Sequence, residues 1–229
     1  MAVWTSLAVS LAGVVLVAAF LAQPVVPVKT ETGLIAWAVF STICLLGAVA
    51  TLFPHYCNPS LVLPDDLEPS KSTMLKGVRF VHGHHPTCGR FDGHEFVIGG
   101  KTYCAGCTGL LVGALSSFSV ATINYFYHYR LPAVSGYIGL GFVALGLLYI
   151  PILKAETPLL RATFNALFVL GFALVLVAVN SAGNAGLELI VIGLSSYWML
   201  TRIQLSRWSH DATCGACDEV CDKKVVLGS

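Results

Sequence analysis

The sequence predicts an all-α membrane protein: a bundle of six transmembrane helices with a small zinc-ribbon-like β-hairpin loop on its cytoplasmic side. Of the 229 residues, 56% are hydrophobic and 11% are charged, with a mean hydropathy of +0.78. Soluble domains are about 45–50% apolar and about 25% charged. Long stretches lack Asp, Glu, Lys and Arg, and seven of the eight cysteines lie on one side of the predicted membrane. The near balance of 13 basic and 12 acidic residues argues against nucleic-acid binding.

Six stretches have the length and apolarity of a membrane span, because about 20 apolar residues cross roughly 30 Å of hydrocarbon. Polar residues and prolines separate them, and Pro132 starts the fourth span at a position where its missing N–H costs nothing. No positive residue precedes the first apolar stretch, so we expect a retained helix instead of a cleaved signal peptide. The predicted spans are 3–22, 33–53, 106–127, 132–152, 161–180 and 184–202.

Lysine and arginine are distributed unevenly between the two sides of the predicted membrane. With the N-terminus in the cytoplasm, eleven of them fall on the inner side, and only Lys29 and Arg130 fall on the outer side. Because cytoplasmic loops are rich in Lys and Arg, we predict a multi-pass protein of the cell membrane with both termini cytoplasmic. The predicted regions are spans 1–2 (1–53), a cytoplasmic Cys/His loop (54–107), spans 3–6 (108–204) and a cytoplasmic Cys-rich tail (205–229).

The predicted loop contains a metal-binding pattern. His85 and Cys88 are followed, after fifteen residues, by Cys104 and Cys107. This two-knuckle spacing is typical of zinc sites, with His85 in the place of the first thiol. Four protein ligands indicate a structural zinc ion rather than a catalytic one. A loop of this size needs such an ion, because it is too small to fold by apolar burial alone.

The insert between the two ligand pairs predicts a hairpin. Two short strands flank Gly99-Gly100, and the hairpin would return the second pair toward the first. His82 and His84 are alternatives to His85 as the fourth ligand. We expect His94 to be a solvent-facing loop residue.

The tail carries a second set of four candidate ligands, with the spacing H-x3-C-x2-C-x3-C. Zinc is the predicted ion, with an iron–sulfur cluster or redox chemistry at Cys214-Gly-Ala-Cys217 as alternatives. Thiols stay reduced in the cytoplasm, which favours metal binding over disulfides. The loop and tail sets share one side of the membrane, so they form either one shared ligand sphere or two sites. The four tail residues are His210, Cys214, Cys217 and Cys221.

The stretch from residue 88 to 113 resembles a family of uncharacterised bacterial and archaeal membrane proteins. The shared pattern is Cys88-x-Arg90, then Cys104-x-x-Cys107-Thr-Gly running directly into a transmembrane helix with a further glycine. In this chain Gly106 stands where the family commonly has arginine, and His85 is three residues from Cys88 instead of adjacent. The resemblance implies a membrane protein of unknown function, so it supports the site and not an activity.

Small residues follow the second cysteine pair at a spacing of four. We expect Thr108 to cap the third span through its hydroxyl group. The small residues would form one helix face that lets a neighbouring helix approach closely. They are Gly109, Gly113, Ser117 and Ala121.

Ionisable residues are rare inside the predicted spans, although transporters usually place such residues there. Glu188 is the only carboxylate, and we expect it to reach water near the outer membrane surface. We expect Asn165 to hydrogen-bond between helices. The single His82-x-His84-His85 run falls short of the several histidine boxes of membrane di-iron enzymes.

The expected function is therefore non-enzymatic. We predict an integral membrane protein with one or two structural zinc ions that acts as a scaffold, an accessory subunit or an interaction module. Its expected partners are the lipid bilayer and other membrane-protein subunits. The alternatives are a membrane thiol oxidoreductase or electron carrier that uses the tail cysteines, and a transporter.

Overall fold

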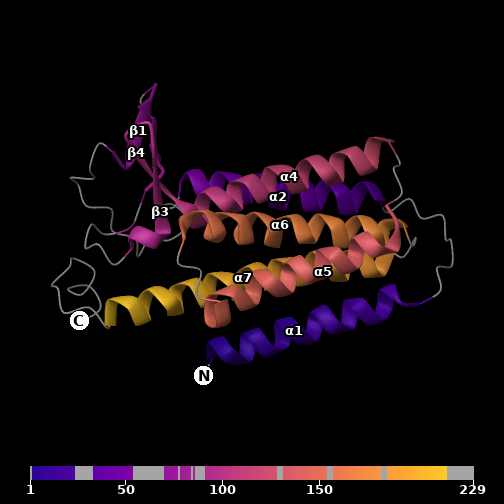
Figure 1. Ribbon diagram of the computed structural model, residues 1–229. Helices are drawn as coiled ribbons and strands as arrows, with labels where there is room; N and C mark the ends of the chain where they lie inside the picture. The colour runs from indigo at the N-terminus through magenta and orange to yellow at the C-terminus, as the bar shows by residue number, and fades with distance from the viewer. Residues whose placement is uncertain are drawn as a thin grey trace.

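The computed structural model describes residues 2–23, 33–53, 70–76, 78–83, 85, 91–127, 131–153, 157–181 and 185–215. Within these ranges long helices lie side by side in one bundle, and two small β-hairpins lie together at one end of it (Figure 1). The helices are α1 (Ala2–Leu21), α2 (Gly33–Leu52), α4 (Ala105–Tyr127), α5 (Ala133–Leu148), α6 (Pro158–Ser181) and α7 (Ala185–Gly215).

Five of these helices are long and apolar enough to cross a membrane: α1, α2, α4, α6, and α5 together with the turn that follows it. This result supports a multi-pass membrane protein, and the five helices agree closely with the first five predicted spans. The sixth prediction, 184–202, corresponds to the start of α7, which is not among the five. We find that α7 continues to Gly215, because no Pro or Gly interrupts residues 194–214.

The centre of the bundle is α6, along which both α4 and α5 pack. The predicted face of small residues on α4 is confirmed as the surface that contacts α6. A Cβ atom added at Gly109 would lie 2.2 Å from the backbone oxygen of Ala162, so the two backbones approach too closely for any side chain. The Ser117 hydroxyl donates a hydrogen bond of 2.9 Å to the carbonyl of Val169. Gly113 and Ala121 are the other buried members of this face.

Two antiparallel hairpins precede α4. The predicted hairpin around Gly99-Gly100 is confirmed, and both glycines have positive φ, 57° and 77°, as a tight two-residue turn requires. The other hairpin was not predicted. The strands are β1 (Ser72–Leu75), β2 (Val78–Val81), β3 (Glu95–Ile98) and β4 (Lys101–Cys104).

Backbone hydrogen bonds join the two hairpins to each other. The Cys104 N–H donates to the carbonyl of His82 at 2.6 Å, and the Thr102 N–H donates to that of Ser70 at 2.8 Å. Because β4 runs directly into α4, Cys104 is both the last strand residue and the neighbour of the first helical residue. The position of the hairpins is therefore tied to a helix that packs on the centre of the bundle.

Two expectations about polar residues are wrong. Thr108 lies inside the first turn of α4, and its hydroxyl donates to the carbonyl of Cys104 at 2.9 Å instead of accepting from an amide. The reason is that α4 begins at Ala105, directly after β4. Glu188 does not reach water: it is 1% exposed and accepts a hydrogen bond of 3.0 Å from the Asn180 amide, because the first turn of α7 packs near the end of α6.

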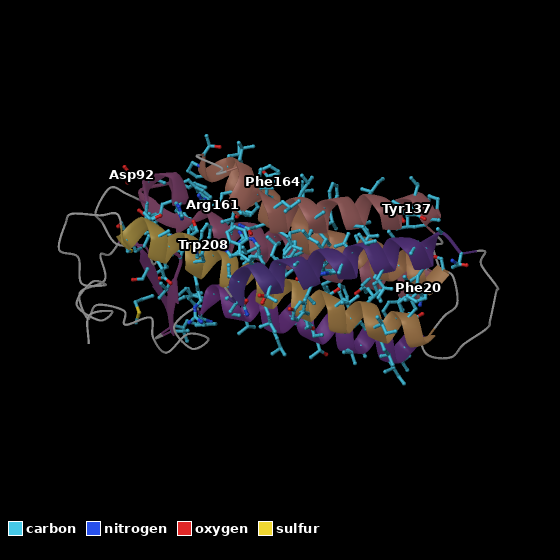
Figure 2. The ribbon with its side chains drawn as sticks, turned by 90° about the horizontal axis from the view of Figure 1, so that it is seen from below. Phe20, Asp92, Tyr137, Arg161, Phe164 and Trp208 are labelled. Atoms are coloured by element: carbon cyan, nitrogen blue, oxygen red, sulfur yellow. The ribbon has the colours of Figure 1, made fainter. Side chains whose placement is uncertain are left out.

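The candidate ligands lie at the end of the bundle where the described chain starts and finishes. The start of α1, the C-terminal end of α7 and both hairpins are at this end (Figure 1). Seen from below, Asp92 and Trp208 lie near it, and Phe20 and Tyr137 lie at the opposite end (Figure 2). The predicted gathering of the loop and the tail on one side agrees with this arrangement. That this side is cytoplasmic stays a prediction.

Candidate metal centre

Three histidines from distant parts of the sequence meet at the hairpin end of the bundle. His85 follows β2, His94 ends a single 3-10 turn (η1, Asp92–His94) before β3, and His210 lies on α7. Each offers one ring nitrogen, and these nitrogens all lie within 4.8 Å of one another. A tetrahedral ion with bonds of about 2.0–2.1 Å holds its nitrogen ligands about 3.3–3.4 Å apart. Small side-chain shifts would therefore bring the three nitrogens to bonding distance from one ion.

An aromatic side chain holds the histidines together and limits their contact with water. Phe91 is 2% exposed, and its ring is stacked on that of His85 with centroids 5.2 Å apart. The centroids of His94 and His210 are 5.1 Å and 5.2 Å from that of Phe91. His85 and His94 are themselves buried. This packing fixes the ring planes and is typical of the apolar surroundings of a metal site.

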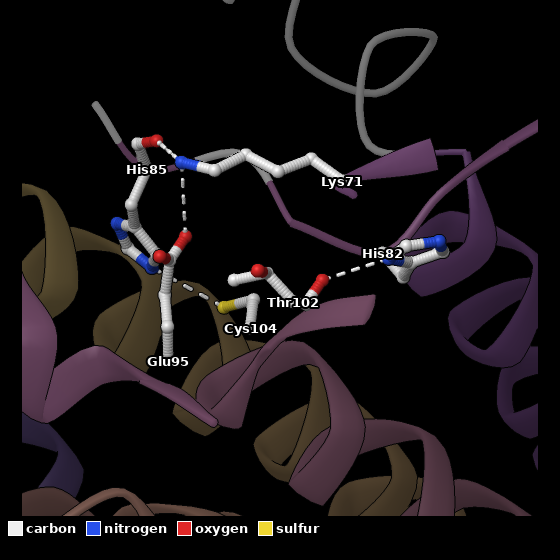
Figure 3. A network of polar contacts seen from close by, with 6 residues as sticks. All are labelled: Lys71, His82, His85, Glu95, Thr102 and Cys104. Atoms are coloured by element: carbon white, nitrogen blue, oxygen red, sulfur yellow. Dashed lines mark hydrogen bonds and ion pairs between the residues drawn. The ribbon is translucent and has the colours of Figure 1, made fainter. Parts of the chain in front are cut away.

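His85 is also fixed through its backbone. Lys71 is 6% exposed, and its ammonium group donates a hydrogen bond of 2.6 Å to the His85 carbonyl. The same ammonium group is 3.6 Å from a carboxylate oxygen of Glu95, the residue that follows His94 (Figure 3). Lys71 thus links the segment that carries His85 to the segment that carries His94.

A pair of thiols adjoins the histidines. The Sγ of Cys104 is 3.3 Å from the Nε2 of His85, and a side-chain hydrogen bond joins Cys104 to Cys107 in the first turn of α4. Across a tetrahedral zinc ion, an imidazole nitrogen and a thiolate sulfur are separated by about 3.6 Å. The spacing of His85 and Cys104 therefore suits two ligands of the same ion. Cys104 is buried, so water does not compete strongly for it.

The structure brings together several of the residues that the sequence predicted as ligands. His85, Cys104 and Cys107 from the loop are adjacent, and His210 from the tail joins them, so the two predicted sets are not separate in the described chain. Cys214 is buried on α7, one turn beyond His210. The remaining predicted ligands, Cys88, Cys217 and Cys221, lie outside the described residues.

His82 does not belong to this cluster. Its Nδ1 is 2.7 Å from the carbonyl of Thr102, and its Nε2 is 3.1 Å from the hydroxyl of Thr73. Both ring nitrogens are therefore engaged within the hairpins, on the far side of Cys104 from His85 (Figure 3). Of the two alternatives to His85, His84 lies outside the described residues.

The expectation that His94 faces solvent is wrong. Its side chain is 9% exposed, because η1 turns it inward below β3. The register of the hairpin contains a signal that sequence reasoning overlooked. Glu95 pairs with Cys104, so the residue before Glu95 must lie beside the residue that starts α4.

Comparisons with known proteins do not add to this description. No protein-family model, no curated protein sequence and no solved structure matches the chain.

Proposed function

We propose that this chain is a multi-pass membrane protein that binds a structural zinc ion in a mixed His/Cys centre at one end of its bundle. The observation that carries the proposal is the convergence of His85, His94 and His210 from three separate segments. Neutral imidazoles suit zinc well, and thiolates beside them strengthen the preference for zinc over hard cations such as magnesium. The ion would join the hairpin segment to the end of α7. This role fits a scaffold or an accessory subunit of a membrane complex.

Metal content of the purified chain tests the proposal. We expect stoichiometric zinc in the wild-type protein and loss of most of it in His210→Asn, because one of three converging ligands is removed. His82→Asn is the matched control. It removes a histidine from the same end of the bundle, but the ring nitrogens of His82 contact Thr102 and Thr73 and not the three converging histidines. Wild-type protein without bound zinc, or equal loss in both variants, would contradict the proposal.

The fourth ligand decides between a closed structural site and an open catalytic one. We propose Cys104, which is the thiol next to His85. Cobalt(II) substituted for zinc reports this directly, because a thiolate bound to cobalt gives an intense charge-transfer band in the near ultraviolet. The band should vanish in Cys104→Ser. If it persists there and vanishes in Cys214→Ser, the fourth ligand comes from α7 instead.

A membrane thiol oxidoreductase is the second candidate, and one observation favours it. Cys104, at the end of β4, and Cys107, in the first turn of α4, are neighbouring thiols joined by a side-chain hydrogen bond. Oxidation to a Cys104–Cys107 disulfide would pass two electrons and two protons to an acceptor such as a partner disulfide. Alkylation of zinc-free protein before and after a reducing agent discriminates the two functions. A zinc centre predicts free thiols in protein isolated from cells, and an oxidoreductase predicts a reversible disulfide.

Orientation in the membrane is a further part of the proposal. The excess of Lys and Arg at the hairpin end favours a cytoplasmic location for it, where thiols remain reduced. A reporter enzyme that is active only in the cytoplasm, fused after Ser229, should be active. Activity only of a reporter that requires export would reverse the orientation and remove the argument for reduced thiols.

A further inference from the structure

A second buried polar group lies between α5, α6 and α7, separate from the histidines. Arg202 is on α7, about two turns before His210. Tyr149 begins a π-helical turn (η2, Tyr149–Leu153), and Asn165 is on α6. All three side chains are buried, with exposed fractions of 5%, 0% and 1% in that order. We call these three residues the Arg202 cluster.

The acceptors of the Arg202 cluster are already in use. The Nη2 of Arg202 donates to the hydroxyl oxygen of Tyr149 and, at 2.7 Å, to the Oδ1 of Asn165. The Nδ2 of Asn165 donates to the same Tyr149 oxygen at 3.3 Å and to the carbonyl of Arg161 at 2.9 Å. Both lone pairs of the Tyr149 oxygen therefore receive hydrogen bonds.

Donors are left over. Within the described chain, the Nε of Arg202 is buried and has no hydrogen-bond partner. The hydroxyl proton of Tyr149 must also be donated, since both hydrogen bonds at its oxygen are accepted ones. A buried donor without an acceptor is costly, and more so when the group is charged. Among the residues that the structure describes, the cluster thus lacks an acceptor.

The described part of the chain also places no negative charge beside the Arg202 cluster. No carboxylate of the described residues lies within 4.0 Å of the Arg202 guanidinium, which instead lies 4.7 Å from the centre of the Tyr149 ring. Arg161 brings a second positive charge close enough to repel that of Arg202. Burial of a cation without an anion is costly. The π-helical turn that places Tyr149 here is an irregularity often found at functional sites.

We propose that the Arg202 cluster binds a phosphate-class oxoanion. Such a ligand supplies what the cluster lacks: negative charge, and several oxygens that only accept hydrogen bonds. The unpartnered Nε–H of Arg202 gives a charge-assisted donor for a phosphate oxygen, and the Tyr149 hydroxyl gives a further donor. The phosphate belongs either to free inorganic phosphate or to the headgroup of an anionic phospholipid. The site goes beyond the zinc centre and does not depend on it.

Thermal unfolding of the full chain in a neutral detergent tests the site. Inorganic phosphate at about tenfold its Kd should raise the Tm by about 3–6 °C relative to chloride of equal ionic strength. The same measurement in vesicles of phosphatidylcholine, with and without phosphatidylglycerol, identifies a lipid headgroup as the source. A response in either arm supports the site, and no response in both overturns it.

Variants separate this site from general effects of charge and from the zinc centre. Arg202→Gln should abolish the response, whereas Arg207→Gln, at an exposed position on the same helix, should retain it. If Arg202→Gln fails to fold, Tyr149→Phe removes the spare hydroxyl donor together with the oxygen that accepts from Arg202 and Asn165, and should weaken phosphate binding. His210→Asn, which removes a zinc ligand and leaves the Arg202 cluster intact, should respond as the wild type does. If phosphate bound to the zinc ion instead, the response would be lost together with the ion. A response that is lost in His210→Asn or Arg207→Gln, but kept in Tyr149→Phe, would overturn the proposal.

Discussion

At the scale of single residues, a buried charge positions the histidine-bearing segments at the hairpin end. Lys71 is the clearest case, because its ammonium group holds the backbone carbonyl of His85 and lies beside Glu95. It fixes two histidine-bearing segments without being a ligand itself. A positioning residue of this kind acts on metal binding through geometry, and its effect should be measurable apart from that of the ligands.

Lys71→Met tests this role. The substitution keeps the apolar stem but leaves the His85 carbonyl without its donor, so we expect the free energy of unfolding to fall by about 1.5–3 kcal/mol. Zinc affinity should fall about 10–100-fold, as is typical when a group that supports a ligand is lost. Lys76→Met, at an exposed lysine after β1, is the control and should change neither. Zinc titration with a competing chelator and thermal unfolding provide the two readouts. Unchanged zinc affinity in Lys71→Met would contradict the role.

At the scale of elements, the bundle depends on close contact between helix backbones. The contact of α4 with α6 at Gly109 leaves no room for a Cβ atom, because the nearest backbone oxygen would be 2.2 Å away. Between apolar helices in lipid, association depends on such close packing more than on the hydrophobic effect. Since β4 continues into α4, the same contact also helps to position Cys104 and Cys107 at the hairpin end of the bundle.

Gly109→Ala should therefore separate α4 from α6. Overpacking of this kind costs about 1–3 kcal/mol, and here the obstacle is backbone, which yields less than a side chain. Gly141→Ala is the matched control, because no atom lies within 4 Å of a Cβ added at that position on α5. Thermal unfolding in detergent should show a lower Tm for Gly109→Ala only. Equal Tm values in the two variants would mean that the close contact of α4 with α6 at Gly109 does not contribute to stability.

The elements themselves were largely predictable from the sequence. Uninterrupted apolar stretches defined five helices, and Gly99-Gly100 defined the second hairpin, because only glycine adopts two consecutive positive φ angles readily. The first hairpin was missed since its turn includes Lys76, whose φ of 49° is uncommon for a residue with a side chain.

The site was predictable only in part. Local spacing identified His85, Cys104 and Cys107 as neighbours, because a knuckle is a feature of a few consecutive residues. The contribution of His94 and the meeting of loop and tail are tertiary properties. They depend on the register of β3 with β4 and on the full length of α7, which carries His210 to the hairpins.

At the scale of the whole molecule, α7 connects the interior of the bundle to the metal centre. Its 31 residues span about 46 Å, more than the roughly 30 Å of hydrocarbon in a bilayer. The start of α7 packs near the end of α6, and Trp208 contacts Trp4 of α1 with ring centroids 5.3 Å apart. Past this contact, His210 is the residue that meets the hairpins in the metal cluster. Any ion bound there would therefore hold the last turns of α7 in place.

Removal of the ion should release those turns. Trypsin cleaves after arginine, and Arg207 is exposed on α7 between Arg202 and His210. We expect a metal chelator to accelerate cleavage after Arg207 in the wild-type protein, because helical backbone must open locally before it enters a protease. In His210→Asn, cleavage should be fast from the start and insensitive to chelator, whereas His82→Asn should behave as the wild type. Mass spectrometry of the fragments identifies the bond that is cut. Cleavage at one constant rate in all these samples would show that the end of α7 is held by protein contacts alone.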